Sequence, residues 1–175
     1  AMIQTGGVYG ADAIMLDLED AVAVNRKDDA RLLVSNMLDA VDFGDVEVSV
    51  RINGMDTPFA ELDLQAIVPK KPDAVRIPKI NSAKDVEAAE KIISRLEEEN
   101  NIPEGTIKIH AMIETALGIE NAYEIACASP RIAAITIGAQ DLTADMNVVK
   151  TEGGEEISYA RRRIVMAAKA AKVAA

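Results

Sequence analysis

Charged and amide side chains follow each of five apolar, β-branched segments of the sequence. In chain order they are Asp17, Glu19 and Asp20, then Arg51 and Asn53, then Lys79, then Glu114, and finally Gln140 and Asp141. In parallel α/β architectures the side chains at the carboxyl ends of the strands converge, and ligands bind there. The sequence therefore predicts one ligand site built from these strand ends.

The residue types suggest which ligand this site would take. Glu114 and Asp141 supply oxygen donors without a cysteine or histidine cluster, which favours Mg²⁺ as the metal. Arg51 offers a planar fork that binds a carboxylate bidentately. Together they fit a 2-oxo or 2-hydroxy acid. Glu19 and Asp20 fit helix caps or surface loops equally well, whereas Glu114 shares its strand face with His110 and Met112.

Other common catalytic sites are not favoured. The single histidine, His110, lies inside a predicted strand and is interpreted as a buried structural residue instead of a general base. Cys127, the only cysteine, excludes an internal disulfide, and its apolar neighbours predict a structural thiol on a core helix. The glycines of TGGVYG (5–10) precede a predicted strand, so dinucleotide and P-loop sites lack their anchor.

Composition and charge exclude several further classes. The formal net charge of −10 argues against a nucleic acid partner. No apolar run reaches the length of a membrane span, and the first residues lack the pattern of a signal peptide. We therefore expect a cytoplasmic protein with no membrane partner.

The elements that must position these residues alternate between strand and helix at roughly 30 residues per unit. Strands are predicted at 13–18, 46–52, 74–79, 107–113 and 132–138, with the final VAA starting another. Helices are predicted at 26–41 with Asn25 as cap, after Thr57-Pro58, after Ser82, from near Ile119 to Ser129-Pro130, and at about 155–172. This alternation is typical of parallel βαβ architecture in one domain, 1–175, either an open doubly wound sheet or a barrel.

Five motifs at these strand ends resemble those of one enzyme family. They are LDLEDAV (16–22) followed by Lys27 and Ala30-Arg31, VRINGMDTP (50–58), VRIPK (75–79), IETALGI (113–119) and IGAQDLTADM (137–146). Together they resemble the citrate lyase β subunits within the HpcH/HpaI aldolase and malyl-CoA lyase family. The resemblance implies a TIM (β/α)8 barrel of roughly 250 residues, with about five βα units present and the first and last strands missing.

The resemblance also implies a Mg²⁺-dependent carbon–carbon lyase that cleaves a citryl thioester into an acetyl thioester and oxaloacetate. It assigns Glu114 and Asp141 as metal ligands and Arg51 as the anchor of the oxo acid. Asp17, Glu19 and Asp20 would orient metal-bound water. Lys79 would stabilise the developing thioester enolate or remain a solvent-facing lysine.

The protein is expected to form a homo-oligomer. It would act beside an acyl carrier protein and a transferase subunit, or directly on the CoA thioester. A malyl-CoA or methylmalyl-CoA lyase, a 4-hydroxy-2-oxo acid aldolase, and a non-catalytic assembly or anion-binding module remain alternatives. Two departures from the family pattern stand out: the FVPG-like first-strand segment and the last-strand aspartate are absent, and Gln140 occupies a position where glutamate is common.

Overall fold

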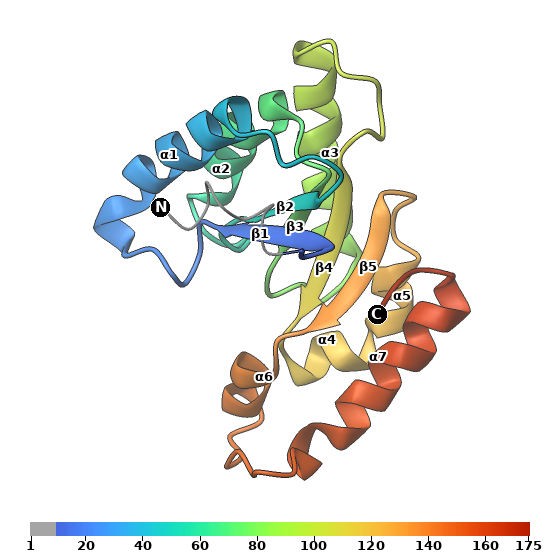
Figure 1. Ribbon diagram of the computed structural model, residues 1–175. Coiled ribbons are helices and arrows are strands. Elements are labelled where there is room, and N and C mark those ends of the chain that lie inside the picture. Colours follow the sequence, from blue (N-terminus) through green and yellow to red (C-terminus); the bar gives the residue numbers. More distant parts are fainter. Residues whose placement is uncertain (1–9) are drawn as a thin grey trace. The chain divides into compact units, whose positions relative to one another are not determined.

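The computed structural model describes residues 10–175, and they form an α/β fold with a five-stranded parallel sheet in chain order (Figure 1). The strands are β1 (Ala13–Asp17), β2 (Glu47–Arg51), β3 (Ala74–Ile77), β4 (Lys108–Ile113) and β5 (Ile132–Ile137). All five predicted strands are confirmed. Only β3 ends clearly early, because Pro78 has no backbone N–H and Lys79 adopts a left-handed φ of 55°.

The helices alternate with these strands. They are α1 (Lys27–Ala40), α2 (Ala60–Ile67), α3 (Ala83–Glu99), α4 (Ala116–Glu120), α5 (Ala122–Ala126), α6 (Ala139–Asp145) and α7 (Ser158–Ala171), with 3₁₀ helices η2 (Val24–Arg26), η3 (Val68–Lys70) and η4 (Glu155–Ile157). Within the described part of the chain, no helix has the length and apolar content needed to cross a bilayer.

Several predicted helix ends differ from the structure. Asn25 does not cap α1, because it lies inside η2, and Thr57-Pro58 forms a turn from which α2 begins only at Ala60. The helix expected from Ile119 is two short helices, α4 and α5, that meet at Asn121. The start of α3 after Ser82 is confirmed, and Asp85 accepts hydrogen bonds there from the Asn81 and Ser82 amides at 2.9 and 2.8 Å.

The chain forms two compact units. Among the described residues, the first contains 10–76 together with Lys91–Lys108, and the second contains Ile77–Glu90 and Ile109–Ala175. TGGVYG (5–10) lies outside the described residues apart from Gly10.

In the first unit the strand register brings the predicted polar ends together. Asp17 on β1 is the register partner of Arg51 on β2, which in turn is the partner of Arg76 on β3. Partners in a parallel sheet point to the same face, so these three side chains share one face. The core beneath this edge is aliphatic, and its side chains include the fully buried Val50, Ile52, Leu64, Ile67 and Val75.

In the second unit β4 pairs with β5, with Ile113 opposite Ile137. The last helix, α7, packs against α5 and β5 through an apolar stripe that includes Ile164 and Ala168 (Figure 1). The VAA prediction is confirmed to the extent of one parallel bridge, in which Ala174 pairs with Ala134 on β5.

Candidate functional site

Arg51 is the centre of an ionic cluster in the first unit. Its Nε and Nη2 donate to the two carboxylate oxygens of Asp17 at 2.8 and 2.5 Å. Its Nη1 lies 3.0 Å from Glu19 Oε2 and 3.7 Å from Asp20 Oδ2. The register of β1 and β2 accounts for this bidentate pair. The structure thus brings together four residues that the sequence placed at strand ends: Asp17, Glu19, Asp20 and Arg51.

Hydrogen bonds and charges within the cluster shift the pKa values of Asp17 and Arg51. Burial raises the pKa of the Asp17 carboxyl, but hydrogen bonds from Arg51 and from the Glu19 amide hold it below its ordinary value overall. The hydrogen bond to Asp17 raises the pKa of Arg51, with the charges of Glu19 and Asp20 adding to it. Asp17 therefore stays ionised and keeps the guanidinium in one orientation.

A buried lysine shapes the loop that carries the acidic residues. Lys27 Nζ donates to the carbonyl oxygens of Leu18 and Glu19 at 2.7 and 2.6 Å. Asn53 Nδ2 also donates to the Leu18 carbonyl oxygen, at 3.0 Å. These bonds fix the backbone of the loop after β1 and so direct Glu19 toward Arg51.

Asp63 is a buried carboxylate that holds Asn53 in place. Its carboxylate is 1% exposed and accepts from the Asn53 amide at 2.9 Å and from Asn53 Nδ2 at 2.6 Å. Its other oxygen accepts from Arg31 Nε at 2.9 Å, which links α2 to α1. Sequence reasoning missed Asp63, because a carboxylate within ELDLQ has the pattern of an exposed helix face.

Glu114 is the central residue of the second unit's cluster. It directly follows β4, its side chain is buried at 3% exposure, and its Oε2 accepts from the Lys79 amide at 3.0 Å. Lys79 thus contacts Glu114 through its backbone amide, which the left-handed turn at φ 55° points at the carboxylate. The Lys79 side chain is exposed.

Gly138 makes room for this carboxylate. A Cβ atom built on Gly138 would lie 2.2 Å from Glu114 Oε1 and 2.5 Å from Glu114 Cγ. The register explains the contact, since Ile113 faces Ile137 and the next residues are Glu114 and Gly138. Sequence reasoning did not identify Gly138, although a glycine directly after a strand and beside a strand-end glutamate is a usable signal.

Asp141 lies in the first turn of α6, a helix that the sequence analysis did not predict. Its side chain is partly exposed, whereas the preceding Gln140 is exposed. Glu114 and Asp141 thus follow two paired strands of the same unit. The described residues contain no group of three or more His, Cys, Asp or Glu arranged to hold a metal ion. A site for Mg²⁺ needs only one or two carboxylates, with water and substrate oxygens as further ligands, so this donor set fits Mg²⁺.

Two other sequence predictions have different outcomes. His110 is buried at 8% exposure, as expected for a structural histidine. Cys127 was predicted to be a structural thiol on a core helix. That prediction was wrong, because Cys127 is exposed and lies just after the last residue of α5. A hydrogen bond to Cys127 raises the pKa of Tyr123 there.

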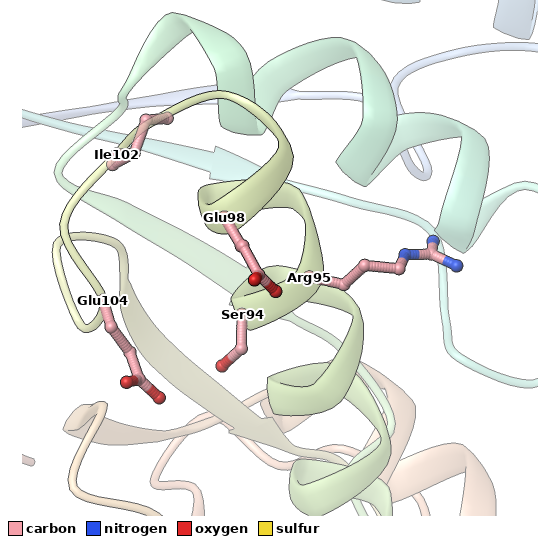
Figure 2. Close-up of a pocket in the computed structure, with 5 residues that line it drawn as sticks. All are labelled: Ser94, Arg95, Glu98, Ile102 and Glu104. Carbon is pink, nitrogen blue, oxygen red and sulfur yellow. The ribbon is translucent and has the colours of Figure 1, made fainter.

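A surface pocket at the end of α3 contains none of the predicted site residues. It is lined by Ser94, Arg95, Glu98, Ile102 and Glu104 (Figure 2). Arg95 extends away from Glu98 and pairs with Glu61 at 2.6 Å. The pocket therefore adds no chemistry to the two clusters.

Comparisons with known proteins identify relatives over the whole chain. Residues 1–175 match the family model described as HpcH/HpaI aldolase/citrate lyase. The citrate lyase subunit beta of Leuconostoc mesenteroides subsp. cremoris is 46% identical over 100% of this chain and 58% of its own length. An L-malyl-CoA/beta-methylmalyl-CoA lyase of Cereibacter sphaeroides is 36% identical over 91% of this chain and 51% of its own.

A solved structure agrees with these matches. The citrate lyase beta subunit from M. tuberculosis, complexed with oxaloacetate and magnesium, superposes with a TM-score of 0.77 at 28% identity, covering 98% of this chain and 70% of that one. The chain spans a little over half the length of the curated relatives given above. Since the family match extends over all 175 residues, this chain belongs to the HpcH/HpaI aldolase/citrate lyase family.

Proposed function

We propose that this chain is part of a Mg²⁺-dependent carbon–carbon lyase that cleaves a citryl thioester to an acetyl thioester and oxaloacetate. The observation that carries the proposal is the buried Glu114 carboxylate, held by the Lys79 amide and seated against Gly138. A carboxylate at a strand end, held in one orientation, is the kind of hard oxygen donor that Mg²⁺ takes in proteins. Family membership and the oxaloacetate and magnesium complex of a relative support the same assignment.

Glu114 and Asp141 would hold the Mg²⁺ ion. Bound there, Mg²⁺ would supply a positive charge that stabilises the substrate hydroxyl oxygen as its proton leaves. Glu114 is fixed before the metal arrives, because its own partners within the unit set its orientation. Such preorganisation avoids a cost of rearrangement during the reaction.

Arg51 would bind the carboxylate of the oxo-acid part of the substrate. A guanidinium has five N–H donors, and Asp17 accepts from one on Nε and one on Nη2, while Nη1 forms an ion pair with Glu19. N–H groups on Nη1 and Nη2 therefore remain for the substrate, and a carboxylate binds such a pair bidentately. Asp17 orients this pair, and Glu19 and Asp20 would order water at the site.

In the cleavage step the hydroxyl proton passes to a general base, the hydroxyl oxygen becomes the ketone oxygen of oxaloacetate, and the electrons of the broken carbon–carbon bond move onto the thioester carbonyl oxygen. That oxygen needs a hydrogen-bond donor or a positive charge while the enolate exists. The Lys79 ammonium is our candidate for this role. An acid must then protonate the enolate carbon to release the acetyl thioester.

The whole protein would extend beyond these residues. We propose that the five βα units belong to a single (β/α)8 barrel domain, of which the present chain supplies the larger part. We further propose a cytoplasmic homo-oligomer that acts with an acyl carrier protein and a transferase subunit, or directly on CoA thioesters. The span of a little over half of its curated relatives supports a larger protein.

A malyl or methylmalyl thioester is the second candidate substrate. The observation favouring it is the 36% identity to an L-malyl-CoA/beta-methylmalyl-CoA lyase. Both substrates present a hydroxyl and a carboxylate to the same metal and arginine. Parallel assays of citryl-CoA and malyl-CoA cleavage by the full-length protein decide between them.

The metal assignment is tested by Glu114→Gln and Asp141→Asn in the full-length protein. Each should abolish Mg²⁺-dependent release of oxaloacetate from citryl-CoA, followed with malate dehydrogenase and NADH. Asp145→Asn is the matched control, because Asp145 also lies on α6 but is exposed and accepts from the Ala116 amide. Unchanged turnover in both site variants would refute the assignment.

A further inference from the structure

A second arginine lies beside Arg51 in the first unit. Arg76 on β3 is the register partner of Arg51 on β2, so their side chains emerge from the same face at the same level of the sheet. Arg76 is partly buried. The face therefore carries two guanidinium groups at the strand end where the oxo-acid anchor is proposed.

The two arginines differ in what compensates their charge. Arg51 contacts three carboxylates, whereas within residues 10–175 Arg76 forms no ion pair, and its buried Nε has no hydrogen-bond partner. Burial lowers the pKa of Arg76, and the charge of Arg51 lowers it further, while the charge of Glu47 only partly offsets both. A buried donor left without a partner is costly, and such a group commonly marks a ligand position.

We propose that Arg76 is a specificity-determining residue that binds a second carboxylate, so that this site takes dicarboxylic 2-oxo acids and their citryl-type precursors. The proposal rests on the proposed function and names its substrate class. It separates the two candidate substrates, because a citryl thioester carries two free carboxylates and a malyl thioester carries one.

The arrangement suits a dianion better than a monoanion. Arg51, whose charge Asp17, Glu19 and Asp20 already compensate, binds one carboxylate through its remaining N–H groups, and that single anion leaves the charge of Arg76 without a partner. A second carboxylate on the same ligand satisfies the Arg76 donors and relieves the repulsion between the guanidinium groups. The three acidic partners of Arg51 do not do this, because they contact Arg51 and not Arg76.

The test compares two 2-oxo acids that differ by one carboxylate. Binding of oxaloacetate and of pyruvate is measured by isothermal titration in saturating Mg²⁺, using the full-length protein and its Arg76→Met, Arg76→Lys and Arg51→Met variants. We expect Arg76→Met to weaken oxaloacetate binding by ~10- to 100-fold, the usual effect of losing a charge-assisted contact, and to weaken pyruvate binding far less. Arg76→Lys should recover part of the selectivity, and Arg51→Met should weaken both ligands.

Controls separate this role from a structural one. Arg95→Met removes an arginine of the same unit that already pairs with Glu61, and it should leave both affinities unchanged. The thermal midpoint of Arg76→Met should not fall, since the variant removes a partly buried charge without a partner. If the wild type binds oxaloacetate but Arg76→Met weakens both acids equally, or neither, the role of Arg76 is refuted and the lyase proposal stands. If the wild type binds neither acid, the proposed function fails and this inference fails with it.

Discussion

Replacing Gly138 with alanine should displace the Glu114 carboxylate from its position. The new Cβ would lie 2.2 Å from Glu114 Oε1, whereas ordinary contacts begin at 3.4 Å. The backbones of the two strand ends cannot easily move apart, because the Gly138 amide donates to the carbonyl oxygen of Ile113, the residue before Glu114, at 3.0 Å. The side chain of Glu114 must therefore move by more than about 1 Å to reach an ordinary contact distance.

Two magnitudes follow from this displacement. Forcing extra volume into a packed site costs about 1–3 kcal/mol of unfolding free energy. A misplacement of about 1 Å at a reacting centre costs on the order of 100-fold in rate. We therefore expect Gly138→Ala in the full-length protein to lose stability by that amount and to lower kcat/KM for citryl-CoA by about two orders of magnitude.

A double-mutant cycle shows whether Glu114 is the cause. Urea denaturation gives the unfolding free energies of wild type, Gly138→Ala, Glu114→Ala and the double variant. In the Glu114→Ala background the clashing atoms are gone, so the added methyl group should cost little.

Gly153→Ala is the matched control, because a Cβ there would have Glu155 Cγ at 3.8 Å as its nearest neighbour. This control should leave stability and turnover close to wild type. An equal cost of Gly138→Ala in both backgrounds would refute the view that Gly138 exists to admit the Glu114 side chain.

Two further predictions concern the first unit. Because the folded-state pKa of Asp17 is held below its unfolded value near 4, its contribution to stability is complete above that pH and is lost as pH falls through the folded value. The difference in unfolding free energy between wild type and Asp17→Asn should therefore be constant from pH 7 to 5 and shrink toward pH 2, and a pH-independent difference would contradict the pairing with Arg51. Asp63→Ala should cost about 3–5 kcal/mol in urea denaturation, because it removes the buried acceptor of the Asn53 amide groups and leaves Arg31 with only its exposed partner Asp28, whereas Glu61→Ala on the same helix breaks only an exposed pair worth under about 1 kcal/mol. Equal losses in these two variants would show that Asp63 has no special role.

The strands and their polar ends were predictable because both signals are local. Five β-branched apolar runs coincide with β1 to β5, and the ionic contacts of Arg51 follow once Asp17 and Arg51 end neighbouring strands. Short helices were less predictable. The seven residues of α6 are too few to display helical periodicity, so the sequence indicated only that Asp141 follows the fifth strand and not that it lies in a helix.

Residues whose roles depend on register were missed. Gly138 lies against Glu114 because Ile113 is the register partner of Ile137. Arg76 lies beside Arg51 because the two are register partners on neighbouring strands. Asp63 has the sequence pattern of a surface carboxylate, and its contacts with Asn53 and Arg31 depend on tertiary structure that the sequence does not display. Cys127 was misjudged for the converse reason, since its apolar neighbours are buried while the helix end leaves the thiol exposed.

Our central proposal is that Glu114 and Asp141 hold the Mg²⁺ ion that oxo-acid binding requires. Isothermal titration of oxaloacetate into the full-length protein, with Mg²⁺ and then with EDTA, tests it most directly when wild type and Glu114→Gln are compared. We predict binding by the wild type in Mg²⁺, none in EDTA, and at least ~10-fold weaker binding by Glu114→Gln in Mg²⁺. Equal binding with and without Mg²⁺, or by both proteins, would contradict the claim.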